Sequence, residues 1–124
     1  MKFKIDTKEI FHVISIEEPG LSANMADELQ LIVAQTQEKD RKSLILKLEQ
    51  AKSIDQHFAE TMLTLSQQVK PENLSFVVCC LSEPVKKTLE GMGILEELNF
   101  APTESEAWDI VQMEEIEREL GEEF

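Results

Sequence analysis

Glycine and cysteine are scarce in this sequence, with four and two residues among 124. The two cysteines, Cys79 and Cys80, are adjacent, which excludes a disulfide framework and favours two small apolar side chains in a reducing compartment. The glycines do not form the glycine-rich loop that cradles phosphates, so no nucleotide or flavin fingerprint is present. No apolar run approaches the ~20 residues of a membrane-spanning helix, so no membrane insertion is expected.

Basic residues are also few. Twelve Lys and Arg face 25 Asp and Glu, and the resulting net charge of −13 repels phosphate backbones and anionic lipids, so nucleic acid is not an expected partner. Residues 103–124 carry nine of the acids and one Arg. Residues 1–4 are not followed by the apolar stretch of a signal peptide, and we expect a cytoplasmic location.

Hydrophobic periodicity predicts alternating strands and helices. Helical spacing follows Ser22 or Asn24, either of which suits an N-cap, and Thr103 with Glu106 forms a capping box before a last helix. The expected strands are residues 2–6, 10–16, 43–48, 74–81 and 98–101, and the expected helices follow residue 22, residue 55, Ser82 and Thr103.

This alternation predicts one α/β domain over residues 1–124, whose strands are largely parallel after the first hairpin. The run 74–81 has no polar alternation, as expected for a central strand covered on both faces, where Cys79 and Cys80 would point to opposite sides. The acidic residues 114–124 are expected to form the end of the last helix, which should fray beyond about Glu117.

Residues 44–55 read Leu-Ile-Leu-Lys-Leu-Glu-Gln-Ala-Lys-Ser-Ile-Asp, an apolar strand, a short loop and an apolar-Asp pair that leads into a helix. This stretch resembles the STAS domain of bacterial anti-sigma factor antagonists. Residues 21–24, 83–89 and 92–95 resemble that family's loop into its first helix, its short third helix and the exit from that helix. The resemblance implies a four- or five-stranded mixed sheet with helices mainly on one face, and a regulatory protein that binds a protein partner and is not an enzyme.

In the STAS family the apolar-Asp pair is usually followed by Ser-Ser-Gly, and a partner kinase phosphorylates the second serine. Here Asp55 is followed by Gln56, His57 and Phe58, so His57 stands at the phosphoacceptor position and the hydroxyl is missing. Lys47 also replaces an acidic residue common in the family's third strand. The resemblance therefore implies an anti-sigma factor or kinase-like partner, bound without the usual phosphoserine switch, and the implied partner-binding residues are Asp55, Gln56, His57, Phe58, Glu60 and Thr61.

Other roles remain open alternatives at this stage. The chain could be an accessory subunit of a larger assembly, such as a lipid-transport ATPase or a stress-signalling complex. Asp55, His57 and Glu60 could bind a metal ion, as in a metal-dependent enzyme, or His57 could accept a phosphoryl group at a helix start. Three polar residues there are more often a cap and a solvated face. No catalytic, cofactor or metal site is expected.

Three aromatic or imidazole side chains have structural interpretations. His12 lies in an apolar strand pattern and is expected to be a packed or edge histidine, and Trp108 is expected to be a half-buried anchor of the last helix. Phe58, although part of the implied contact surface, begins the stripe completed by Met62, Leu65 and Val69, which predicts that its ring turns into the core.

Overall fold

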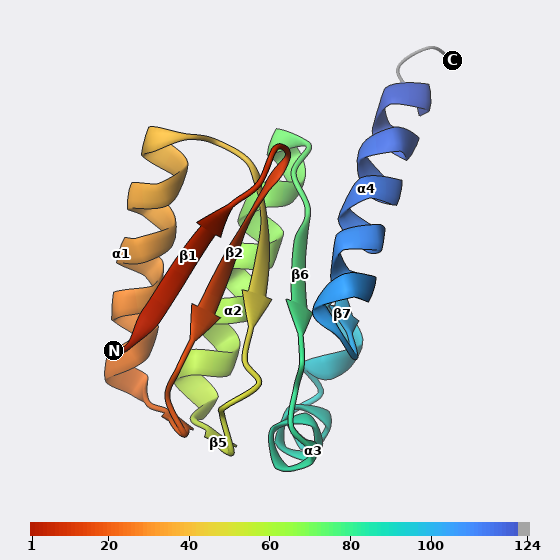
Figure 1. Cartoon of the computed structure of the whole chain (residues 1–124). Coiled ribbons are helices and arrows are strands. Elements are labelled where there is room, and N and C mark those ends of the chain that lie inside the picture. Colours follow the sequence, from red (N-terminus) through yellow and green to blue (C-terminus); the bar gives the residue numbers. More distant parts are fainter. Residues whose placement is uncertain (122–124) are drawn as a thin grey trace.

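The computed structural model describes residues 1–121 and centres on a five-stranded mixed sheet (Figure 1). The strand order is β1-β2-β4-β6-β7, in which β1 pairs antiparallel with β2 and the other neighbours are parallel. The predicted α/β class and mixed sheet are confirmed. The strand bounds are β1 Phe3–Thr7, β2 Phe11–Ile16, β4 Ser43–Lys47, β6 Phe76–Cys79 and β7 Phe100–Ala101.

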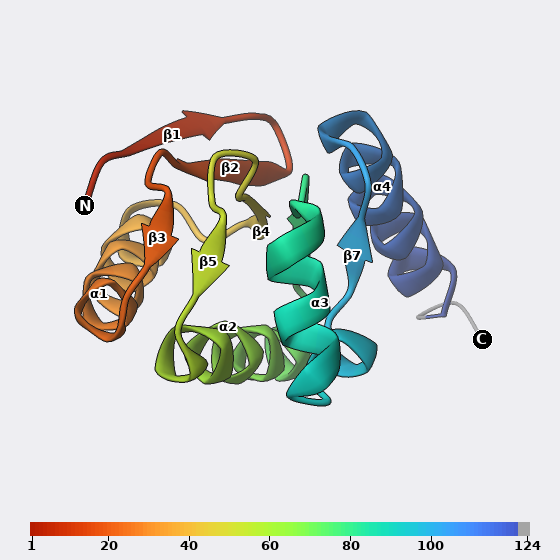
Figure 2. The same ribbon diagram turned by 90° about the horizontal axis from the view of Figure 1, so that it is seen from below.

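Three helices cover one face of this sheet and one helix covers the other (Figures 1 and 2). Helices α1 (Ala23–Lys39), α2 (Gln56–Val69) and α3 (Glu83–Gly91) share the first face, and α4 (Glu104–Gly121) packs alone on the second. Short 3-10 turns at Lys70–Glu72 and Leu95–Glu97 follow α2 and α3. The expectation of helices mainly on one face therefore holds.

The alternation of side chains along the central strands divides the core between the two faces. Leu44 and Leu46 of β4 pack with α1 and α2, whereas Ile45 between them packs with α4. In β6, Val78 packs on the face covered by α1 and α2, and Val77 packs on the face covered by α4. The interior place predicted for the 74–81 segment is thus confirmed, with a strand shorter than expected.

A two-stranded parallel sheet lies apart from the main one and brings two helix starts together. It pairs β3 (Gly20–Leu21) with β5 (Ser53–Ile54), immediately before α1 and α2. Gly20 suits this close approach, because a Cβ there would lie 3.2 Å from the Ser53 hydroxyl oxygen. Figure 2 shows β3 and β5 side by side at the end of the molecule where α1 and α2 begin.

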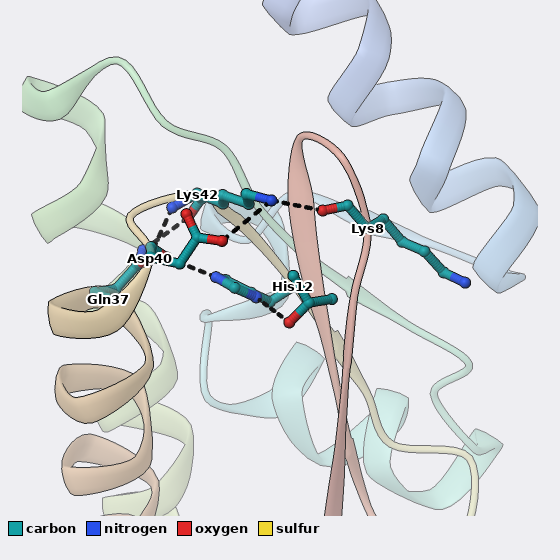
Figure 3. Close-up of polar contacts among 6 residues, drawn as sticks. Lys8, His12, Gln37, Asp40 and Lys42 are labelled. Carbon is teal, nitrogen blue, oxygen red and sulfur yellow. Dashed lines mark hydrogen bonds and ion pairs between the residues drawn. The ribbon is translucent and has the colours of Figure 1, made fainter.

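A buried histidine ties the first hairpin to the end of α1 (Figure 3). His12 is 2% exposed; its Nε2 lies 2.7 Å from the Asp40 carbonyl oxygen and its Nδ1 2.8 Å from the Thr7 hydroxyl. The Lys42 ammonium donates to the Lys8 carbonyl at 2.8 Å. His12 is therefore packed, as predicted, and both of its ring nitrogens have partners.

The structure corrects three local expectations. Strand β6 ends at Cys79, and Cys80 has a positive φ of 62°, so both cysteines pack toward the α4 side instead of opposite faces. Ser82 stands at the N-cap of α3, but its hydroxyl donates to the Ala51 carbonyl at 2.7 Å and does not cap the helix. Helix α4 continues past Glu117 to Gly121, and residues 122–124 lie outside the described part of the chain.

The last helix is anchored as the sequence predicts at its start. The Thr103 hydroxyl accepts from the Glu106 amide at 3.2 Å, and the half-buried Trp108 ring meets Phe11 edge-on at 5.1 Å between centroids. Within residues 1–121, no helix is both long and apolar enough to cross a membrane.

Candidate binding surface at the start of helix α2

The start of α2 is defined by Asp55. Its carboxylate accepts a hydrogen bond from the His57 amide at 2.8 Å, and its own amide donates to the Leu21 carbonyl at 2.8 Å. The first contact caps the helix by satisfying an otherwise unpaired amide, and the second fixes the helix start to β3. Ile54, immediately before, is buried in the core, so the loop position is set from both sides.

Three further polar side chains near the start of α2 are exposed beside Asp55. Gln56 donates to the Glu60 carboxylate at 2.8 Å, one turn along the helix. The His57 ring is 55% exposed and its Nε2 lies 3.7 Å from an Asp27 oxygen of α1. The structure thus places Asp55, Gln56, His57 and Glu60 together on one solvent-facing surface.

Phe58 and Thr61 do not belong to that surface. Phe58 is 0% exposed and Thr61 is 4% exposed, and Phe58 packs in the core cluster with Met62 and Leu65. The predicted inward turn of the Phe58 ring is confirmed. Both residues must therefore be removed from the set implied by the family resemblance, because side chains on the buried face of α2 are not accessible to a partner.

Neighbouring segments extend the surface in ways that the sequence did not indicate. Asp27 comes from the first half of α1, and Lys52 and Ser53 are exposed in the segment held by the Pro19 carbonyl, which accepts from both of their amides. The bond from Ser82 to the Ala51 carbonyl brings the start of α3 to the same loop. Pairing of β3 with β5 creates this grouping, and no local sequence signal specifies it.

The residues near the ends of β4 and β6 are engaged in internal contacts. Lys47 lies 3.2 Å from Glu104 and 3.9 Å from Glu49, and hydrogen bonding to Glu104 raises the pKa of the Lys47 ammonium. Burial raises the pKa of the Cys79 thiol well above its usual range, which keeps it protonated and a poor nucleophile at neutral pH. The ion pair between Lys47 and Glu104 therefore links the end of β4 to the start of α4.

The first turn of α2 also does not form a metal site in the described structure. Across residues 1–121, no three His, Cys, Asp or Glu side chains are grouped so that they could hold a metal ion. The carboxylates of Asp55 and Glu60 instead accept hydrogen bonds from the His57 amide and from Gln56. What this arrangement offers is a fixed polar surface for contact with another molecule.

Comparison with known proteins matches the chain to the STAS domain over residues 3–107. The chain belongs to the STAS domain family. No curated protein sequence matches it. The resemblance read from residues 44–55 is thus confirmed at the level of the family.

Several solved structures share the fold at low sequence identity. A variant of RsbS from Moorella thermoacetica has a TM-score of 0.74 and 16% identity, covering 90% of this chain and 96% of that one. The anti-sigma factor antagonist SpoIIAA in its unphosphorylated form has a TM-score of 0.74 and 17% identity, covering 90% of this chain and 96% of that one. SpoIIAA, a Bacillus cell-fate determinant, also matches in its phosphorylated form. An anti-sigma factor antagonist from Mycobacterium paratuberculosis has a TM-score of 0.71 and 13% identity, covering 90% and 93%.

Proposed function

We propose that this STAS domain is a non-catalytic regulatory module that binds a protein partner through the surface of Asp55, Gln56, His57 and Glu60. The observation that carries the proposal is the exposed, capped first turn of α2 in a fold shared with anti-sigma factor antagonists. An anti-sigma factor or a kinase-like regulator is the partner class that this likeness suggests. The proposal includes a cytoplasmic location and a single domain over residues 1–124.

The surface is suited to binding because its geometry is fixed before any partner arrives. The Asp55 cap, the bond from Gln56 to Glu60 and the pairing of β3 with β5 restrain the backbone and the side chains of Asp55, Gln56 and Glu60. Such preorganisation lowers the entropy lost on association. The buried Phe58 ring beneath the first turn supports the surface from the core side.

We also propose that the domain works without the phosphoserine switch of its relatives. A phosphate at a helix start is stabilised by the free amides, and its two negative charges disrupt a partner interface by repulsion and desolvation. Residue 57 is a histidine, Thr61 is buried, and Ser53 lies in β5 before the helix. Binding would then be constitutive or governed by protein abundance.

Affinity capture from the native lysate, read by mass spectrometry, tests the proposal. Gln56→Arg places a large cation in the centre of the surface and should abolish capture of the specific partner. Gln67→Arg makes the same change at an exposed site in the last turns of α2 and should leave capture unchanged. Equal capture by both variants would contradict the proposed surface.

A second candidate function, that of an accessory subunit of a larger assembly, is favoured by the similarity of the fold to another solved structure. The fold matches a component of the stressosome structure, a signal integration and transduction hub, with a TM-score of 0.71 and 16% identity. The same capture experiment separates the two candidates. Recovery of a single kinase-like regulator supports the first, whereas recovery of several assembly subunits, or of a transport ATPase, supports the second.

A further inference from the structure

The outer edge of the main sheet carries apolar side chains that the core does not cover. Strand β1 is exposed along its whole length, with Phe3 at 39% and Ile5 at 41% exposure. Both side chains line a shallow pocket of about 250 Å³ between β1 and α1. Leu31, 59% exposed, lies one turn before the pocket residue Gln35 on α1, so it continues the apolar surface.

The backbone of β1 also has unused hydrogen-bonding groups at this edge. The Glu17 amide donates to Lys2 and the Lys8 amide donates to Phe11, both at 2.8 Å, so the even-numbered residues of β1 form the hydrogen-bonded pairs with β2. In an antiparallel ladder the intervening residues point their N–H and C=O groups the other way. Phe3, Ile5 and Thr7 therefore present their backbone groups outward, on the side away from β2.

This edge is held in a fixed position. Figure 3 shows two contacts that join the hairpin to the end of α1: the His12 ring reaches the Asp40 carbonyl, and the Lys42 ammonium donates to the Lys8 carbonyl. The other ring nitrogen of His12 contacts the Thr7 hydroxyl. A rigid edge strand with apolar side chains and free backbone groups is a template for another strand.

We propose that a second copy of this chain occupies the edge, by antiparallel pairing of β1 with β1 about a two-fold axis at Ile5. Phe3 then lies opposite Thr7 of the second copy and Ile5 opposite Ile5, and the outward groups form about six backbone hydrogen bonds. Between these pairs, Lys4 of each copy lies directly opposite Asp6 of the other. The two sheets join into one continuous sheet, with both α1 helices on the same side.

Within the strand residues Phe3–Thr7, charge favours this register over its neighbours, although Lys2 and Lys8, which flank the strand, then lie opposite each other in the two copies. A shift of two residues in one direction places Lys4 opposite Lys4, and in the other direction Asp6 opposite Asp6. Like charges directly opposite are destabilising, whereas opposite charges stabilise a strand pair. The Lys4 and Asp6 side chains are 75% and 65% exposed, so the ion pairs that they make within one copy, Lys4 with Glu17 at 3.8 Å and Asp6 with Lys8 at 3.0 Å, are weak enough to rearrange.

The other exposed apolar surface of the described chain fits a second copy less well. Met113, Ile116 and Leu120 form a stripe on α4, but this helix carries seven acids and one Arg between residues 104 and 121. Two such helices face to face would repel each other.

Pairing through β1 also leaves the Asp55 surface of each copy free, so the dimer would present two partner-binding surfaces and gain from bivalent attachment.

Complementary charge variants test the proposal. Lys4→Glu gives a strand with acids at positions 4 and 6, and Asp6→Lys gives one with bases at both. Each variant alone should dimerise about tenfold or more weakly than the wild type, because both cross-strand pairs become repulsive. An equimolar mixture of the two should regain the dimer, because every pair is then of opposite sign.

Analytical ultracentrifugation from micromolar to millimolar protein measures these states, with circular dichroism to confirm that each variant is folded. Lys87→Glu, an exposed charge reversal on α3, is the matched control and should dimerise as the wild type does. A wild type that is monomeric throughout this range, or a folded mixture that stays monomeric, would overturn the proposal.

Amide hydrogen exchange tests the register independently. In the dimer, the outward amides of Phe3, Ile5 and Thr7 should gain protection as protein concentration rises, whereas the amides of Lys4 and Asp6 are protected by β2 at every concentration. A dimer that forms without protecting the three outward amides, such as one through α4, would show that the copies meet elsewhere and would refute pairing through β1.

Discussion

Replacement of Phe58 by alanine is the sharpest test of the packing beneath the α2 surface. The ring is 0% exposed and lies in the larger core cluster with Met62, Leu65 and Val69. Truncation of a fully buried phenylalanine costs about 3–5 kcal/mol, through lost transfer free energy and the cavity left behind. For a domain of this size, that loss corresponds to a fall in Tm of roughly 10–20 °C.

Urea unfolding followed by circular dichroism, together with a thermal melt, measures this loss. Phe58→Leu, which keeps most of the volume, should cost about 1.5 kcal/mol or less. Leu31→Ala, a truncation of a largely exposed residue, should change the free energy of unfolding by no more than about 0.5 kcal/mol. The reasoning is refuted if Phe58→Ala costs less than about 1 kcal/mol, or if it abolishes partner capture while the protein remains fully folded, because an exposed contact residue would behave in that way.

Three further predictions follow from named contacts. When incubated with a serine kinase of the anti-sigma type and ATP, the wild-type chain should incorporate no phosphate at the start of α2, whereas the His57→Ser variant should be phosphorylated there. Stoichiometric phosphorylation of the wild type in this region would contradict the proposed lack of a phosphoserine switch. A thiol reagent should modify the partly exposed Cys80 in the native protein and Cys79 only after unfolding, as peptide mapping can show. Between neutral pH and the ordinary lysine pKa of 10.5, the coupling energy between Lys47 and Glu104 in a double-mutant cycle should be constant, because the folded pKa of Lys47 is raised. It should vanish as the pH rises through that folded value, and a coupling that persists well beyond it would exclude an ion pair.

The position of the α2 surface at the tips of the parallel strands explains how a small domain can present it rigidly. Loops at this end are short, and each is tied to another by a backbone or hydroxyl contact, as Asp55 is to Leu21 and Ser82 is to Ala51. The proposed partner would therefore meet a surface whose shape is determined by the sheet and not by a flexible loop. Substitutions at exposed positions there should alter binding with little effect on folding.

Local sequence determined most of the secondary structure of this protein. Apolar spacing alone located α2 and the inward turn of Phe58, because only one face of a helix can pack on the sheet. Ser22 was one of two possible caps of α1, and Asp55 belonged to a polar group expected to cap α2, since short polar side chains can accept from unpaired amides; the structure has both residues as caps. The unbroken apolar run near Val77 indicated an interior strand, because both faces of such a strand are covered.

The tertiary structure alone decided how these elements meet. The left-handed backbone at Cys80 ends β6 and turns its side chain toward α4, which no strand pattern indicates. The Ser82 hydroxyl leaves its own helix because the Ala51 carbonyl, 31 residues away in sequence, is within reach. The contact of His57 with Asp27 and the free edge of β1 likewise depend on which segments become neighbours in space. Periodicity specifies which side of an element is buried, but long-range packing specifies what lies against it.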